Sequence, residues 1–421
     1  MKISVFGATL QAGVLAGLLA EHGHQVFWCA NELNNSFDPL VIHYQDDFVN
    51  RLIKQQIANG FLQRVVSEQL PLDSEVYFYG FGTSELERTK ALIKKISMLP
   101  IIHPKLMING STFGLQGTEQ LRQLLPQDSW AYLPDVIQEG NAVKSLVSVK
   151  QVIVGVDNKK TENLIKELLR PFFQFKHQYL FMPILDAEFT KLSISGMLAT
   201  RISYMNDLAL VTEKLGIDIV NVQQGLAADS RIGAAYLSPG TGFGGENFSQ
   251  DILTLSSTVS KTGDKSQLLD QVWTINEQQK EILFRKLWNY YHGNLAGKVV
   301  AIWGASFKEN TSSIDNAPIH VMLAALWAQG VKVQLHDPQA LDAVHKVYGH
   351  RDDLILCEDQ YLAIENAHAL CLMTAWKQYL SPDFNVLSQK MAYPFILDGR
   401  NIYDPSYVKK QGFTYQGVGR S

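Results

Sequence analysis

The chain has 421 residues, of which 46% are hydrophobic and 19% charged, an ordinary balance for a globular protein of two or three domains. Its formal net charge of −4 gives no reason to expect nucleic acid as the main partner. The first residues show no signal-peptide pattern and the sequence has no apolar run of about 18 residues, so we expect a cytoplasmic protein without a membrane partner.

Residues 1–31 predict a strand, a glycine turn, a helix and a second strand, which together open a Rossmann unit. The dinucleotide pattern G-x-G-x-x-G/A falls on Gly7, Thr9 and Ala12. The middle position must let the backbone nearly touch a pyrophosphate, and Thr9 adds a β-branched side chain there. Ala30 stands where an acidic residue should bind the ribose hydroxyls, and Glu32 follows two residues later. These residues are compatible with two alternatives. One is a working NAD site, and the other is a Rossmann unit whose dinucleotide site has decayed.

The rest of the chain predicts further strands and one long helix. A buried strand that ends in a turn is expected within 76–83, and a further strand and turn within 106–112, and residues 152–155 complete the first α/β domain. Residues 187–215 have helical apolar spacing, with Gly196 as the only helix-weakening residue. Residues 297–308 open a second α/β domain. The cysteines at positions 29, 357 and 371 have no metal-ligand spacing, which favours reduced, packed thiols and no metal site.

The stretch 238–251 holds four glycines between positions 240 and 245. Such a run lets backbone amides close on a ligand, although by itself it equally indicates a flexible surface loop. Arg231 supplies a cation just upstream, and Asp251 supplies a carboxylate just downstream.

This stretch resembles the active-site loop of the UDP-glucose / GDP-mannose dehydrogenase family, which has R-I-G followed by G-[YF]-G-G-S-C-F-x-K-D. Arg231-Ile232-Gly233, Gly242-Phe243-Gly244-Gly245, Phe248 and Asp251 fit that pattern in register. Asn247 stands in the place of the cysteine, which in the family is the covalent nucleophile.

The resemblance continues over nearly the whole chain. Residues 76–83 take the place of A-V-x-T-P, and residues 106–112 that of K-S-T-V-P. Residues 133–142 resemble N-P-E-F-L-x-E-G-[ST]-A, and residues 187–191 match A-E-x-x-K. Ser195 takes the place of the asparagine that the family has one helical turn after its lysine.

The second α/β domain is also similar. Residues 299–315 resemble V-x-x-L-G-x-A-F-K-x-x-T-D-D-x-R, with Lys308 and Thr311 kept and Asp315 in place of the arginine. Residues 396–404, which include Arg400, match a later strand and turn of the family.

The resemblance implies an α/β fold with two Rossmann-like, doubly wound domains joined by a long central helix and a helical dimerisation domain. Its boundaries would be 1–186 for the NAD-type domain, 187–290 for the dimerisation domain and 291–421 for the nucleotide-sugar-binding domain. It also implies a homodimer, NAD as cofactor, and a nucleotide sugar, with a UDP-sugar first, as ligand.

The resemblance assigns three sets of site residues. The catalytic positions are Asp135, Glu139, Lys191, Ser195, Asn247 and Asp251. The nucleotide-sugar contacts are Thr112, Arg231, Phe243, Gly244, Gly245, Lys308 and Arg400. The cofactor contacts are Gly7, Thr9, Ala12, Ala30, Thr83 and Asp315.

The substitutions have chemical consequences. The family oxidises a sugar C6 alcohol to a carboxylate in two NAD-dependent hydride transfers, through a thiohemiacetal and a thioester. That chemistry needs a nucleophile that is also a good leaving group, and the amide of Asn247 is neither. At the cofactor site, Asp315 replaces attraction to a pyrophosphate by repulsion.

We therefore expect a diverged protein that binds NAD weakly or not at all but retains nucleotide-sugar binding. Two alternatives remain from the sequence. One is an active NAD-dependent enzyme with altered chemistry, such as a two-electron oxidation or an epimerisation. The other is a structural or regulatory dimer partner of an active paralogue.

Overall fold

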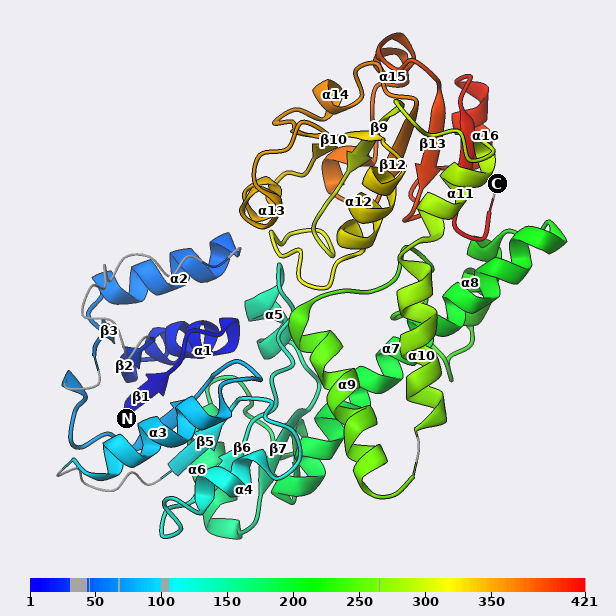
Figure 1. The fold of residues 1–421 in the computed structure, drawn as a ribbon. Coiled ribbons are helices and arrows are strands. Elements are labelled where there is room, and N and C mark those ends of the chain that lie inside the picture. The colour runs from blue at the N-terminus through cyan, green and yellow to red at the C-terminus, as the bar shows by residue number, and fades with distance from the viewer. Residues whose placement is uncertain (31–43, 45, 67–68, 100–105, 265, 421) are drawn as a thin grey trace. The chain divides into compact units, whose positions relative to one another are not determined.

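A computed structural model of the chain describes residues 1–30, 44, 46–66, 69–99, 106–264 and 266–420. Figure 1 traces the fold. The chain separates into two compact units, Met1–Ile194 and Ser195–Ser421. Within the described residues, no helix is both long and apolar enough to cross a membrane.

The N-terminal unit is built on an eight-stranded sheet in the order β3-β2-β1-β4-β5-β6-β7-β8. Its strands are β1 (Lys2–Phe6), β2 (Gln25–Cys29), β3 (Leu62–Arg64), β4 (Val76–Tyr79), β5 (Leu106–Asn109), β6 (Trp130–Tyr132), β7 (Val152–Val156) and β8 (Tyr179–Met182). Neighbouring strands run parallel, apart from the antiparallel pair β6 and β7. The expectation that residues 152–155 complete this domain is wrong, because β8 pairs with β7 and extends the sheet.

The helices of this unit are α1 (Leu10–Glu21), α2 (Asp47–Ala58), α3 (Leu86–Ser97), α4 (Gly117–Arg122), α5 (Ala142–Val147) and α6 (Lys159–Leu169). They cover both faces because successive strand residues point to opposite sides of the sheet. Ile3 and Val5 pack with α1 and α2, whereas Phe6, Tyr77 and Tyr79 pack with α3 and α4.

The C-terminal unit has a six-stranded parallel sheet in the order β11-β10-β9-β12-β13-β14. Its strands are β9 (Val299–Trp303), β10 (Lys332–His336), β11 (Leu354–Leu356), β12 (Ala369–Leu372), β13 (Phe395–Asp398) and β14 (Thr414–Gly417). The strand order reverses at β1/β4 in the first sheet and at β9/β12 in the second. In doubly wound sheets, ligands bind at such switch points, outside the carboxyl ends of the strands.

The helices α12 (Pro318–Ala328), α13 (Leu341–Tyr348), α14 (Gln360–Ala363), α15 (Phe384–Lys390) and α16 (Pro405–Lys410) cover this second sheet. The same unit contains α8 (Ile219–Ala228), α9 (Glu246–Lys261), α10 (Gln267–Gln279) and α11 (Ile282–Tyr290).

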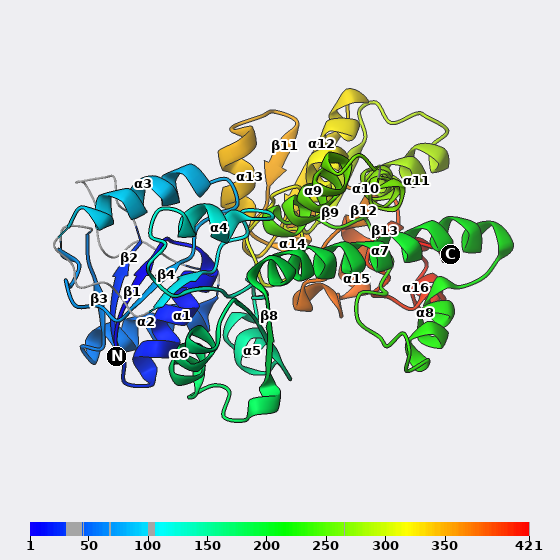
Figure 2. The ribbon, with the colours of Figure 1, turned by 90° about the horizontal axis from the view of Figure 1, so that it is seen from below.

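The long helix α7 (Ile184–Leu215) is continuous through Gly196, as its apolar spacing predicts. A Cβ on Gly196 would lie 3.0 Å from Leu255 of α9 and 3.3 Å from Leu269 of α10. The glycine therefore permits close packing of these three helices, which lie together in both views (Figures 1 and 2).

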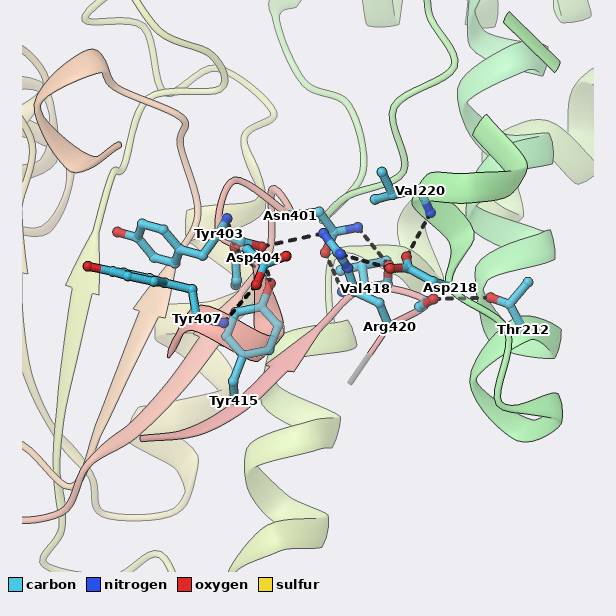
Figure 3. A network of polar contacts seen from close by, with 12 residues as sticks. Thr212, Asp218, Val220, Asn401, Tyr403, Asp404, Tyr407, Tyr415, Val418 and Arg420 are labelled. Atoms are coloured by element: carbon cyan, nitrogen blue, oxygen red, sulfur yellow. Dashed lines mark hydrogen bonds and ion pairs between the residues drawn. The ribbon is translucent and has the colours of Figure 1, made fainter. Parts of the chain in front are cut away.

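The last residues of the chain bind the end of α7 and the start of α8 (Figure 3). The Gly419 amide donates to Glu213 Oε1 over 2.8 Å, and its carbonyl accepts from the Ile219 amide over 3.0 Å. Arg420 Nη2 lies 2.7 Å from Oδ2 of Asp218, the residue that caps α8. These contacts hold the sheet of the C-terminal unit against the helices that precede it.

Candidate functional site

The glycine-rich loop of the C-terminal unit is buried from residue 239 to residue 245, so the alternative of a flexible surface loop is excluded. Side-chain amides bind its backbone on both sides. Asn206 Oδ1 accepts from the Gly240 amide, and Gln279 Nε2 donates to the Gly240 carbonyl, each over 2.8 Å. Asn276 binds both the amide and the carbonyl of Phe243, over 2.7 and 3.1 Å.

Two positions of this loop require glycine. A Cβ on Gly244 would lie 2.8 Å from the Asn316 carbonyl oxygen and 3.0 Å from Phe307 Cβ. Gly245 has a φ of +89°, and its amide donates to the Asp315 carbonyl over 2.8 Å. The loop therefore packs directly on the segment that follows β9.

A buried polar chain continues from this contact. Lys280 Nζ donates to Asn316 Oδ1, and Asn316 Nδ2 donates to Ser249 Oγ, each over 2.7 Å. Lys280 also pairs with Glu277 at 2.8 Å, although its side chain is only 2% exposed. Asn276, Gln279 and Lys280 are not among the predicted site residues; their spacing of three and four positions, which places them on one face of a helix, was the available signal.

The helix α9 begins at Glu246, directly after the loop. Asn247 lies in its first turn and is exposed. Asp251 lies in the second turn of this helix. Its carboxylate is 1% exposed and accepts a 2.7 Å hydrogen bond from the Ser195 hydroxyl of α7.

Arg400 lies at the switch point of the second sheet. Its Nε donates to the Met373 carbonyl over 2.6 Å, and its Nη2 donates to the Phe307 carbonyl over 3.2 Å. A Cβ on Gly240 would lie 3.3 Å from Arg400 Nη1, so the guanidinium is next to the glycine-rich loop. Burial lowers the pKa of Arg400, against the opposing effect of nearby carboxylates. A bound anion would offset that desolvation and pair with the guanidinium fork.

Three predicted residues of the same unit lie at its surface or its edge. Lys308 is partly exposed and directs Nζ over the Phe307 ring, 5.5 Å from the centroid. Asp315 is exposed and accepts from the Ser313 hydroxyl over 2.8 Å. The Arg231 side chain is 87% exposed and pairs with Asp229 of its own turn, so it does not join the loop and Arg400 within one chain.

In the N-terminal unit, the predicted cofactor residues meet at the switch point of the first sheet. Gly7 has a φ of +97°, and Thr9 caps α1. The Thr9 hydroxyl donates to the Gly80 carbonyl over 3.0 Å and accepts from the Ala12 amide over 3.3 Å. Ala30 follows β2 and is buried, whereas Glu32 lies outside the described residues.

The other predicted residues of this unit follow the strands of the same sheet. Thr83 lies in the turn after β4 and Thr112 in the loop after β5, and both are partly buried. Asp135 follows β6, where its Oδ1 accepts from the Ile137 amide over 3.0 Å, and Glu139 is exposed. Lys191 is buried in the part of α7 that belongs to this unit.

The chain is similar to known proteins. Two family models match the chain. The central domain of the UDP-glucose/GDP-mannose dehydrogenase family covers residues 185–278, and the UDP binding domain of the same family covers residues 301–405.

Known relatives match the chain over its full length. A UDP-glucose 6-dehydrogenase from Pseudomonas aeruginosa is 31% identical over 447 aligned residues, which cover 100% of this chain and 98% of the relative. A UDP-glucose 6-dehydrogenase from Rickettsia bellii is 26% identical and covers 100% and 99% of the two chains.

Solved structures have the same fold. A UDP-glucose dehydrogenase from Pyrobaculum islandicum superposes with a TM-score of 0.86 at 23% identity, covering 100% of this chain and 98% of that one. A UDP-D-ManNAc dehydrogenase from Pyrococcus horikoshii superposes with a TM-score of 0.83 at 21% identity, covering 100% and 99%. Because the similarity to the Pseudomonas protein spans both chains and agrees with the two domain matches, this chain belongs to the UDP-glucose/GDP-mannose dehydrogenase family.

Proposed function

We propose that this chain binds a nucleotide sugar but does not complete the four-electron oxidation of a sugar alcohol to a carboxylate. The observation that carries the proposal is Asn247, an amide on the exposed first turn of α9 beside the buried glycine-rich loop. A thioester route needs a nucleophile that also leaves, and an amide nitrogen with a delocalised lone pair does neither.

Ser249 and the two cysteines of the C-terminal unit are poor substitutes for the thiol. Ser249 is 4% exposed, and its hydroxyl already accepts a hydrogen bond from Asn316. The cysteines of the C-terminal unit, Cys357 and Cys371, are free and buried, and burial raises the pKa of both thiols. They stay protonated near neutral pH and are therefore poor nucleophiles.

The ligand we propose is a nucleoside-diphosphate sugar, with a UDP-sugar first. Arg400 presents a desolvated guanidinium at the switch point, and the glycine-rich loop lies against it. Lys308 directly follows Phe307, whose carbonyl accepts from Arg400, and would add a second cation. A diphosphate satisfies such groups because Arg and Lys form charge-assisted hydrogen bonds with phosphate oxygens. The match of residues 301–405 to a UDP binding domain supports this choice.

The proposal includes a homodimer, with 187–290 as the dimerisation domain between Rossmann-like domains at 1–186 and 291–421. Arg231 would then reach the ligand of the partner subunit. Its exposed guanidinium supports this role, and so do the exposed apolar side chains of α7, including Met197, Tyr204 and Val211.

Titration of UDP-glucose tests the ligand. We expect saturable binding to the wild type, and Arg231→Ala and Lys308→Ala should each weaken it. Loss of a charged hydrogen bond of about 1.5–3 kcal/mol corresponds to roughly 10- to 150-fold in affinity. Lys409→Ala removes an exposed lysine from α16 and is the charge-matched control, with unchanged affinity expected.

Two results would contradict the proposal. Steady production of two NADH per UDP-glucose by the purified protein would show that the oxidation is complete without the thiol. Absence of saturable binding to every UDP-, GDP- and TDP-sugar would leave the purely structural dimer partner as the better function. A single NADH per sugar would instead support the two-electron alternative.

A further inference from the structure

We propose that the dinucleotide crevice of the N-terminal unit is closed by two of its own side chains, Thr9 and Tyr44, so that this unit binds neither NAD nor NADP. The inference concerns a different unit from the nucleotide-sugar site, and it is tested with the dinucleotide alone. It therefore stands or falls separately from the proposed function.

The crevice lies at the switch point between β1 and β4, where a dinucleotide places its pyrophosphate over the glycine turn. In this chain the turn after β1 touches the turn after β4. A Cβ on Gly7 would lie 2.0 Å from the Gly80 carbonyl oxygen. The Thr9 hydroxyl spans the same gap by donating to that oxygen over 3.0 Å.

Thr9 also uses a donor that a phosphate would need. The first amides of α1 point out of its N-terminus and are the groups that bind phosphate in this fold. The Ala12 amide donates instead to the Thr9 hydroxyl over 3.3 Å. The Thr9 side chain therefore obstructs the close approach of a pyrophosphate to the turn. Its hydroxyl also takes the hydrogen bond from the Ala12 amide that a phosphate oxygen would otherwise accept.

Tyr44 covers the turn from the other side. Its hydroxyl donates to the carbonyl oxygens of Ala8 and Thr9, over 3.2 and 3.1 Å. The neighbouring Gly7 carbonyl accepts from Trp28 Nε1 over 2.9 Å. Three consecutive carbonyl groups of the turn are thus bound by aromatic side chains from outside it.

The Tyr44 ring fills the space between the end of β2 and the first turn of α1. A Cβ on Gly13 would lie 2.4 Å from Tyr44 Cε2. The ring stacks on Trp28 with centroids 6.4 Å apart, and Tyr44 is only 9% exposed. The ribose of a dinucleotide occupies this region in a Rossmann unit, between the second strand and the helix N-terminus.

Entry of a dinucleotide would therefore require the Tyr44 ring and the Thr9 hydroxyl to leave their contacts together. A ligand that binds only the minor open state has its apparent affinity reduced by the fraction of molecules that are open. Removing both side chains should raise the affinity, because the backbone of the turn keeps the geometry of its fold.

The experiment measures NAD and NADP binding by calorimetry to the wild type, Thr9→Gly, Tyr44→Ala and the double variant. We expect no saturable binding to the wild type, and an affinity at least about tenfold higher for the double variant. Thr9→Gly keeps an accepted helix N-cap residue. Quenching of Trp28 fluorescence gives a second readout, because Trp28 stacks on Tyr44.

Tyr179→Ala is the matched control. Tyr179 is also 9% exposed, and its hydroxyl donates to the Phe173 carbonyl over 2.8 Å, but it begins the strand β8 at the far edge of the sheet. Tyr179→Ala should not raise the affinity for NAD or NADP. If the double variant does not fold, the combination of Thr9→Gly with Tyr44→Phe replaces it. That variant keeps the aromatic ring, so its affinity for the dinucleotide should rise by a smaller factor.

Micromolar binding of NAD to the wild type would overturn the inference. An absence of binding to the wild type and to every opened variant would also overturn it, because the loss would then lie elsewhere in this unit, for example with Ala30. A higher affinity for NAD or NADP in the variants of Thr9 and Tyr44, with no change in Tyr179→Ala, supports the inference.

Discussion

The side-chain amide of Asn276 binds both backbone polar groups of Phe243, accepting from its N–H over 2.7 Å and donating to its C=O over 3.1 Å. An asparagine amide carries the same donor and acceptor types as a peptide group, so one side chain of α10 takes the role of a neighbouring strand. Asn276 is fully buried. The conformation of the glycine-rich loop therefore depends on a residue 33 positions away.

Asn276→Ala is expected to lower the free energy of unfolding by about 1–3 kcal/mol, because it leaves a buried N–H and C=O of Phe243 without their partner. Urea unfolding of wild type and variant measures the difference. Asn289→Ala, on the exposed side of α11, should stay within about 0.5 kcal/mol of the wild type. Equal stability of all three proteins would contradict the role of Asn276.

Ser195→Ala is expected to cost more stability than Ser203→Ala. Both serines are buried in α7, but the Ser195 hydroxyl donates to the Asp251 carboxylate, whereas that of Ser203 donates to the Val272 carbonyl. Hydrogen bonds to charged groups contribute about 1.5–3 kcal/mol and those between neutral groups about 0.5–1.5 kcal/mol. Thermal unfolding of the two variants side by side tests the order, and a reversed order would refute it.

Arg420→Ala is expected to destabilise the C-terminal unit by about 1.5 kcal/mol, since it removes a charged hydrogen bond to Asp218. The two side chains are 11% and 31% exposed, so solvent screens the pair only partly. Lys2→Ala breaks the more exposed pair with Asp73, where the side chains are 39% and 50% exposed, and should cost less stability because solvent screens that pair. Limited proteolysis should also cut the Arg420 variant faster after residue 417.

Glu188 is expected to make stability depend on pH. Its carboxylate is buried in α7 and accepts from the amides of Gln116 and Thr118, over 2.7 and 2.8 Å. Burial raises the pKa of Glu188 above its ordinary value of about 4.3, although those hydrogen bonds oppose the shift. The folded state therefore holds the proton to higher pH than the unfolded state does. Its stabilising contribution is complete below the ordinary pKa and is lost as pH rises through the raised pKa.

Glu188→Gln removes this titration and keeps an oxygen acceptor. The free energy of unfolding of the wild type, relative to the variant, should fall as pH rises above about 4.3. Urea unfolding at several pH values measures it. Glu87→Gln on α3 controls for the loss of one negative charge, and a wild-type advantage that grows with pH would contradict the sign.

Asn247→Cys is expected not to restore production of two NADH per UDP-glucose. The exposed first turn of α9 would present the thiol, but Ser195 and the residues at the first glycine turn would remain as they are. Alkylation of the new cysteine checks that it is accessible. Full turnover by this single variant would show that the thiol is the only function the chain lacks.

Much of the architecture follows from the sequence. Apolar runs predicted a strand within 76–83, a strand within 106–112 and the helix through Gly196, because periodicity reports which residues face a core. The motif around residues 242–251, together with its counterparts along the chain, identified the family and the two-sheet fold. These features depend on residues that are close together in the chain.

The contacts that decide the sites depend on residues far apart in the chain. Tyr44 binds the turn at Thr9, Asn276 binds Phe243, and Arg400 binds the carbonyl of Met373. Hydrogen-bonded pairs of this kind produce no periodic pattern in the sequence. Which residues pair depends on how whole helices and strands pack, and on the need of buried N–H and C=O groups for a partner. The sequence by itself determined the fold and the absence of a cysteine at position 247, whereas only the tertiary structure decided which side chains close on the two glycine-rich turns.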